Sequence, residues 1–278
     1  MSSLIELAKK DFIQIKPIVQ HLMHYINISA YLKGFGRGRI WVNNKTKPKS
    51  AVIWDLTNTF IFLAGDAENQ TFNDSFRQLI TDVITPYFLE KKINLIYFFP
   101  GSTDWEKQIP EILDDREWGK RLIDHYIYNP TNFHLIKDWS NNLPPHHQMI
   151  QITKEFLKRD NLTNFDTIDY SISAVWQSTE RFLKDGIGFC LVDNESIASW
   201  CVTDYVIDDH CELYIETFEG YQKKGYGTLV ASAVIEECLK KNYIVHWHCW
   251  ESNIGSIKTA LKVGFDLKGK DVVLKLPI

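Results

Sequence analysis

The chain lacks the features that mark membrane proteins and nucleic-acid-binding proteins. No apolar stretch reaches the length of about 20 residues that a membrane-spanning helix needs. Basic residues are not in excess, because 31 Lys and Arg stand against 35 Asp and Glu and give a formal net charge of −4. A protein that binds nucleic acid draws most of its affinity from a basic surface. We therefore expect neither a membrane nor a nucleic acid among its partners.

Cysteine is scarce, and its arrangement excludes several kinds of site. The five cysteines form no C-x-x-C pair, and an odd number does not suit a disulfide framework. Most of them lie in apolar runs, where small buried thiols are common. The first residues show no basic region followed by an apolar core, so no signal peptide is expected. Together these absences favour the reducing cytoplasm.

The composition is otherwise that of an ordinary globular protein. Hydrophobic residues make up 45% and charged residues 24% of the 278 residues, a length that suffices for two domains. The most linker-like stretch lies at 141–147 and contains the stiff pair Pro144-Pro145. We predict an N-terminal domain over 1–140, a linker over 141–147 and a C-terminal domain over 148–278.

The most informative stretch is a strand, a loop and a helix between residues 211 and 241. The apolar pattern predicts a strand over 211–217 and a helix over 228–241. The loop between them reads Gln222-Lys223-Lys224-Gly225-Tyr226-Gly227. Two glycines let a ligand approach the backbone closely, and a helix N-terminus beside two lysines suits phosphate. The pattern predicts a cradle for a pyrophosphate, and an ordinary turn with two glycines is the alternative.

The two halves of the chain show a similar order of predicted elements. The N-terminal half has a helical region over 4–32, three short strands, a long helix over 72–91, a strand, a helix and a strand. The C-terminal half has a strand, two helices, three antiparallel strands, a helix, a strand, a helix and a strand pair. In the N-terminal half the turn at 65–71 has one glycine, two acids and no lysine. We expect that half to bind no cofactor.

A second motif follows in the C-terminal half. It consists of Asn253-x-x-Ser256 after a strand and Gly264-Phe265 after the next helix, and Asn253 is also a good helix N-cap. This motif and the Gln-x-x-Gly-x-Gly loop, in this order of elements, resemble the GNAT superfamily of N-acetyltransferases. The whole chain resembles the two-domain type related to zwittermicin-resistance acetyltransferases, and the segments 49–54, 63–66 and 215–217 carry that similarity.

The resemblance implies a fold, an activity and a cofactor. The fold class is α+β with a mixed sheet, in which a degenerate GNAT-like N-terminal domain precedes a C-terminal GNAT acyl-CoA acyltransferase fold. The activity is direct transfer of an acetyl group from acetyl-CoA to a primary amine of a small molecule, by a monomer or a homodimer. The implied cofactor-binding residues are Ile215, Thr217, Gln222, Lys223, Lys224, Gly225, Tyr226, Gly227, Thr228, Asn253 and Ser256.

Direct transfer also needs a base, because an alkyl ammonium has a pKa of about 10 and is protonated at pH 7. Glu212 and Glu216 lie at i and i+4 on one face of the predicted strand. Glu216 is the first choice because it is nearer to the proposed thioester, and Glu212 is the second. His246 and His248 share a face of the next strand, where they either relay a proton or are ordinary core histidines.

One position departs from the family pattern. Many relatives carry a Tyr in the late helix that protonates the leaving thiolate, and aligning Asn253 and Gly264 places Ala260 there. Tyr214, Tyr226 or water would then take the role. The missing Tyr supports an alternative function, a non-catalytic acyl-CoA sensor or a partner-binding scaffold.

The remaining motifs do not indicate a further catalytic, metal or nucleotide site. Cys211 has no neighbouring pattern that would activate it as a nucleophile. The run His246-x-His248-Cys249 comes without a fourth ligand, so we predict no metal site. The glycine-rich stretch 33–39 follows a predicted helix and is interpreted as a connection. The sequence does not identify the acceptor amine.

Overall fold

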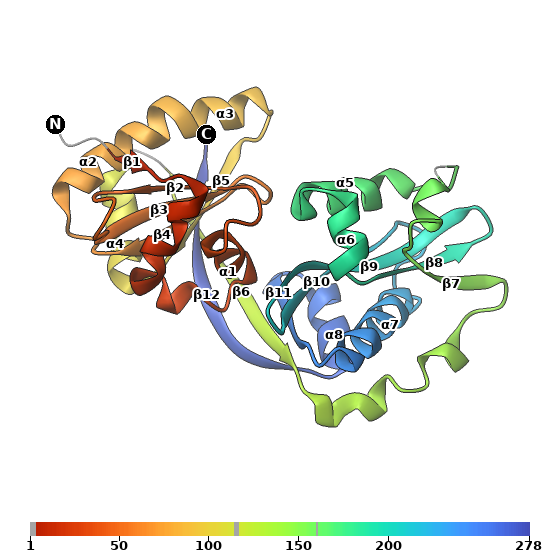
Figure 1. Cartoon of the computed structure of the whole chain (residues 1–278). Helices are drawn as coiled ribbons and strands as arrows, with labels where there is room; N and C mark the ends of the chain where they lie inside the picture. The colour runs from red at the N-terminus through yellow and green to blue at the C-terminus, as the bar shows by residue number, and fades with distance from the viewer. Residues whose placement is uncertain (1–3, 114–116, 160) are drawn as a thin grey trace. The chain divides into compact units, whose positions relative to one another are not determined.

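The structure, a computed structural model, describes residues 4–113, 117–159 and 161–278. The chain folds into two compact units (Figure 1). Unit 1 comprises Met1–Ile123 and Asp271–Ile278, and unit 2 comprises Asp124–Lys270. Two strands, β6 (Gly119–Tyr128) and β12 (Phe265–Pro277), contribute residues to both units.

Unit 1 is built on strands in the order β1-β2-β3-β4-β5-β12. Its other strands are β1 (Ile5–Glu6), β2 (Gly38–Val42), β3 (Ser50–Asp55), β4 (Phe60–Gly65) and β5 (Leu95–Pro100). Neighbours are antiparallel except β4 and β5, which run parallel and stay paired from Phe60↔Tyr97 to Leu63↔Pro100. Every residue of β3 is buried, so this strand forms the middle of the unit.

Helices of unit 1 pack on these strands through aromatic side chains. They are α1 (Ile26–Leu32), α2 (Gln70–Leu79), a π-helix (Ile80–Ile84), α3 (Thr85–Glu90) and α4 (Thr103–Ile112), with 3₁₀ helices at Lys9–Ile18 and Gln20–Leu22. The predicted long helix over 72–91 is present as the run from α2 to α3. The helical region predicted from residue 4 is wrong at its start, because Ile5 and Glu6 pair with β2 as a strand.

Unit 2 is built on strands in the order β6-β11-β10-β9-β8-β7. These are β7 (His147–Gln151), β8 (Gly188–Asp193), β9 (Ser196–Ile207), β10 (His210–Thr217) and β11 (Ile244–Trp250), beside β6. Strands β7 to β10 are antiparallel neighbours, whereas β10 and β11 run parallel. Both units therefore contain mixed sheet, as predicted.

Two pairs of helices cover the strands of unit 2 on opposite faces, α5 and α6 on one and α7 and α8 on the other (Figure 1). These helices are α5 (Phe165–Trp176), α6 (Thr179–Asp185), α7 (Tyr226–Lys240) and α8 (Ile254–Val263), with 3₁₀ helices at Pro130–Leu135, Trp139–Asn142 and Phe156–Lys158. The predicted order of elements in this half is present except at its end, where the single strand β12 takes the place of the predicted strand pair. Among the described residues, no helix is both long and apolar enough to cross a membrane.

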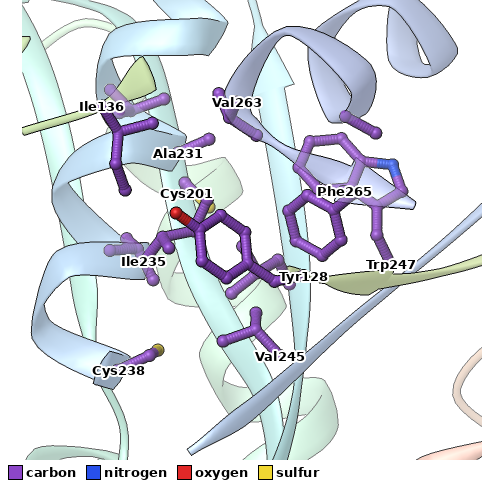
Figure 2. Close-up of a cluster of buried hydrophobic side chains, with 14 of the residues drawn as sticks. Tyr128, Ile136, Cys201, Ala231, Ile235, Cys238, Val245, Trp247, Val263 and Phe265 are labelled. Carbon is purple, nitrogen blue, oxygen red and sulfur yellow. The ribbon is translucent and has the colours of Figure 1, made fainter. Parts of the chain in front are cut away.

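The core of unit 2 fixes α7 against the strands. The helix presents two rows of apolar residues, and Val230, Val234 and Ile235 are fully buried. Trp247 of β11 and Phe265 of β12 pack edge to face with centroids 5.4 Å apart beneath α8, and Tyr128 of β6 joins them (Figure 2). Because α7 is held along its length, the position of its first turn is also set.

The division into units differs from the predicted domain boundaries at both ends. Residues 124–147 belong to unit 2, because Tyr128 and Ile136 are buried in its core and Trp139 donates Nε1–H to the Glu236 carboxylate of α7 at 2.7 Å. Residues 271–278 belong to unit 1, where Leu274 and Leu276 pair with β5. The predicted linker at 141–147 contains the end of a 3₁₀ helix and the first residue of β7.

Candidate functional site

The two parallel strands of unit 2 separate partway along their length. Strand β10 pairs with β11 at His210↔Ile244, Cys211↔Val245 and Glu212↔His246. No further β10–β11 pair is present among the described residues, although β10 continues to Thr217 and β11 to Trp250. On its other side β10 stays paired with β9 up to Thr217↔Ser199, with a register shift between Cys211 and Leu213. The edge of β10 that faces β11 therefore has no strand partner over 213–217 in the described part of the chain.

The helix that follows β10 begins without a side-chain cap. Gly225 is the N-cap residue of α7, has φ +83° and forms no side-chain hydrogen bond to the first turn. A Cβ atom placed on Gly225 would meet no atom within 4 Å. The first N–H groups of a helix carry partial positive charge and need acceptors. The structure thus leaves the first turn of α7 without a side-chain cap, and open at Gly225, where the sequence predicts a pyrophosphate cradle.

The loop before α7 is anchored to the end of β10. Gln222 donates from Nε2 to the Thr217 carbonyl oxygen at 3.1 Å, and Ser199 lies 2.8 Å from Thr217 through their hydroxyl oxygens. A Cβ atom on Gly227 would lie 3.1 Å from Thr217 Oγ1 and 3.5 Å from Ile215 Cδ1. Glycine at 227 therefore allows the first turn of α7 to lie directly against the end of β10. Lys223 and Lys224 are exposed in this loop.

The second motif lies at the start of α8. The Asn253 Oδ1 atom accepts from the Ser256 N–H at 3.1 Å, so Asn253 caps this helix as its sequence context indicates. The Ser256 hydroxyl oxygen accepts from Trp247 Nε1 at 2.9 Å and ties α8 to β11. Gly264 ends the helix with φ +108°, the left-handed conformation expected there. The sequence prediction missed Thr259, whose Cγ2 lies 4.0 Å from the Cβ position of Gly227.

The two candidate bases occupy different surroundings on β10. Glu216 is half-buried, and burial raises the pKa of its carboxyl above the usual value. Among the described residues its carboxylate makes no hydrogen bond or ion pair. Glu212 sits at the last β10–β11 pair, and its Oε1 lies 2.8 Å from His248 Nδ1. The side chain of His248 is 6% exposed and that of Glu212 is 20% exposed, so their contact is largely shielded from water.

Histidines gather beside this carboxylate. His246 Nε2 lies 2.7 Å from His210 Nδ1, and His246 Nδ1 lies 3.2 Å from His125 Nε2. The rings of His125 and His248 lie parallel, with centroids 4.6 Å apart. The sequence indicated that His246 and His248 share a face, but it missed His125 and His210. His210 joins the group because β10 pairs in parallel with β11, and His125 joins it because β6 lies beside β11. In the sequence, the only sign of this was that residues 210 and 212 alternate in the same way as 246 and 248.

The possible proton donors for a leaving group also differ in burial. Ala260 is fully buried in the core, so α8 offers no donor at the aligned position. Tyr214 is 47% exposed on the same face of β10 as the two carboxylates, and burial together with the charges of Asp204 and Glu216 raises its pKa. Tyr226 is buried, with its ring 5.1 Å from that of His147. Of the two tyrosines, Tyr214 is the one that solvent reaches.

The thiols are placed for packing rather than chemistry. All five cysteines are buried. A hydrogen bond to Cys238 and burial raise the pKa of Cys211, so this thiol is not activated as a nucleophile. Within the described ranges, no group of three or more His, Cys, Asp or Glu side chains is arranged to hold a metal ion.

Comparison with solved structures shows which known fold the chain has. The fold is that of GCN5-related N-acetyltransferases. A GCN5-related N-acetyltransferase-like protein from Streptococcus suis 89/1591 superposes with a TM-score of 0.64 at 19% identity, over 86% of this chain and 88% of that one. A tandem GNAT protein from the clavulanic acid biosynthesis pathway superposes with a TM-score of 0.58 at 10% identity, over 98% and 97% of the two chains.

Sequence comparison then assigns the family. A family model for GNAT acetyltransferase matches residues 16–273, and the chain therefore belongs to the GNAT acetyltransferase family. A curated relative, the N-acetyltransferase YdfB of Bacillus subtilis (strain 168), described as uncharacterized, is 26% identical over 268 residues and 95% of each chain. The family resemblance stated from the sequence is confirmed, and the chain is an N-acetyltransferase of this family.

Proposed function

We propose that unit 2 transfers an acetyl group from acetyl-CoA directly to a primary amine of a small molecule. The observation that carries this proposal is the separation of β10 from β11 after Glu212, directly beside the uncapped first turn of α7. A strand edge with unused backbone groups can pair with an extended amide-containing arm. A neighbouring helix N-terminus can hold a diphosphate at the end of that arm. Family membership supports the same conclusion.

The residues at the loop and the helix start fit the cofactor. The space at Gly225 leaves room for a diphosphate against the N–H groups of Tyr226, Gly227 and Thr228, and Lys223 and Lys224 add positive charge nearby. The edge of β10 from Ile215 to Thr217 would hold the pantetheine arm, and Asn253 would reach it with its amide N–H groups. When bound, acetyl-CoA supplies the acyl thioester. A backbone N–H of β10 would stabilise the developing oxyanion.

We assign the base to Glu212 in preference to Glu216. Both carboxylates lie on one face of β10, but within the described part of the chain only Glu212 touches a group that can take a proton onward, His248 at 2.8 Å. Glu212 also sits where the strands begin to separate. The raised pKa of Glu216 is compatible with a base, so this residue is retained as the alternative to be tested.

Unit 1 supports a second part of the proposal, that it carries no cofactor. Its strands β4 and β5 stay paired from Phe60↔Tyr97 to Leu63↔Pro100, the last residue of β5, instead of separating partway along β5. The helix after β4 is capped, because Asn69 Oδ1 accepts from the Phe72 N–H at 3.1 Å. A Cβ atom on Gly65, the last residue of β4, would lie 1.9 Å from the Lys49 carbonyl oxygen, so backbone fills the space beside the end of this strand. The pairing of the two strands and the capped helix are the opposite of what unit 2 shows.

The test combines binding and turnover. Calorimetry measures acetyl-CoA binding to the full chain, and release of free thiol measures transfer to a panel of amines that includes amino acids, polyamines and aminated sugars. Binding together with thiol release that depends on one class of amine is the expected result. Binding without thiol release on any amine would instead favour an acyl-CoA sensor. Absence of binding at millimolar acetyl-CoA would overturn the proposal.

A further inference from the structure

The imidazoles of unit 2 form a connected series that begins at Glu212 and ends at the surface. His248 touches Glu212, His125 lies against His248, His246 touches His125, and His210 touches His246. His246 is 4% exposed, whereas the His210 side chain is 42% exposed. His210 Nε2 also lies 3.6 Å from the Asp209 carboxylate, which is itself 64% exposed. The series thus joins a shielded carboxylate to solvent.

The contacts suit proton transfer because of how the ring nitrogens are used. A neutral imidazole has one nitrogen that donates and one that accepts. His246 uses both nitrogens, Nδ1 toward His125 and Nε2 toward His210, so it can take a proton on one side and release one on the other. His210 likewise has Nδ1 toward His246 and Nε2 toward Asp209. Histidine is also the side chain whose ordinary pKa suits exchange near neutral pH.

We propose that these four histidines form the exit route for the proton that acetyl transfer releases, an inference that rests on the proposed function. As the amine nitrogen bonds to the acetyl carbon, one of its N–H bonds breaks and the proton forms an O–H bond on Glu212. The carbon–sulfur bond of the thioester breaks in the same transfer, and coenzyme A leaves as a thiolate that takes a proton from solvent. The proton on Glu212 passes to His248 Nδ1 and restores the carboxylate. His248 then releases the proton of its other nitrogen, Nε2, to His125, whose ring lies parallel to it and must rotate to accept that proton and then turn back toward His246. His246 and His210 carry it to water beside Asp209. Glu212 is the catalytic residue, and the histidines act through it.

The test removes the outer end of the route, where folding is least at risk. His210→Gln keeps a polar side chain at a partly exposed position, and His246→Gln interrupts the series at its buried centre. His134→Gln is the matched control, because His134 is exposed in the 3₁₀ helix at Pro130–Leu135 and lies outside the series. We expect kcat to fall roughly 10- to 100-fold in both relay variants, within the range of a proton-transfer contribution, with unchanged acetyl-CoA affinity and an unchanged control.

A structural role and a relay role are separated by chemical rescue. Free imidazole added at tens of millimolar should restore most of the lost rate to His210→Gln, because a diffusing base can meet the series at its surface end. An unchanged kcat in the relay variants would overturn the inference while leaving the proposed function intact. A lowered kcat that imidazole does not restore in His210→Gln would also overturn it. If the parent protein releases no thiol with any amine, the proposed function is wrong, and the proton route is wrong with it because no acetyl transfer releases a proton.

Discussion

The Glu212 carboxylate, in the last residue pair between β10 and β11, meets the His248 imidazole at 2.8 Å. The parallel ladder places them there, because Glu212 pairs with His246 and His248 is two residues further on the same face of β11. The contact therefore follows from where the strands stop pairing. The same point opens the strand edge that we assign to the acetyl-CoA arm, so the base and the cofactor edge share one structural origin.

Gly225→Glu should abolish acetyl-CoA binding. The new side chain would occupy the open space at the start of α7 and place a carboxylate where we expect a diphosphate, and like-charge contacts cost several kcal/mol, or about 100-fold or more in affinity. Gly220→Glu is the matched control, because Gly220 has the same φ of +83° and also has no atom within 4 Å of its Cβ position. Both variants share the backbone strain, and calorimetry should show loss of binding only at 225. Equal affinity in the Gly225 variant and the parent would remove the loop assignment.

Exchanging the two carboxylates for amides identifies the base. Glu212→Gln keeps the shape of the side chain but removes its proton affinity, so kcat/KM should fall by about 10²- to 10⁴-fold. Glu216→Gln should cost less, because its carboxylate touches no proton acceptor among the described residues. Thiol-release kinetics with the best amine measure both. The reverse ranking would return the role to Glu216, the first choice from the sequence.

The loop and the late motif could be predicted because their chemistry is local. A strand, a polar turn with Gly225 and Gly227, and an amphipathic helix lie within about 30 residues, and each residue type has one physical reason to be there. The cap at Asn253 and the left-handed stop at Gly264 are likewise short-range features, and both are present. For such segments, sequence spacing is close to spatial spacing.

The histidine series and the unit boundary depend on long-range pairing and were missed for that reason. His125 lies 121 residues from His246 in the chain, and no periodicity links them. The boundary was expected at the Pro-Pro stretch, but Tyr128 and Ile136, which precede that stretch in the chain, are already buried in the core of unit 2. Only the strand order, with β6 beside β11, explains both outcomes.

The pKa of Glu216 predicts a pH-dependent effect on stability. Burial raises this pKa in the folded state, so the folded protein holds a proton that the unfolded chain has released, and stability is lost as pH rises through the raised pKa. Glu216→Gln removes that loss. The melting temperature of the variant relative to the parent should therefore be higher at pH 7 than at pH 4. A difference that is the same at both pH values would show that the carboxyl does not have a raised pKa.

The protein's own cysteine thiols should not react measurably with the disulfide reagent of a thiol-release assay. Burial raises the pKa of Cys190 to about 12 and that of Cys201 and Cys249 above the usual value. A thiol reacts with a disulfide reagent through its thiolate, which is rare at pH 8 when the pKa is raised. In native buffer, the reagent should label few cysteines within minutes. In strong denaturant it should label all five, and rapid native labelling would contradict the buried arrangement.

Asn253 caps α8, and we propose that it also binds the cofactor arm; two substitutions can separate these roles. Its Oδ1 caps α8 by accepting from the Ser256 N–H, which leaves the amide NH₂ for the cofactor arm. Asn253→Asp keeps an equally good capping oxygen but has no amide donor, whereas Asn253→Ala loses both. We expect weaker acetyl-CoA binding in both variants and a loss of about 1 kcal/mol of stability only in the Ala variant. Calorimetry and urea unfolding measure the two effects. If Asn253→Asp binds acetyl-CoA as tightly as the parent, Asn253 is only a helix cap, and the cofactor arm is held by β10 alone.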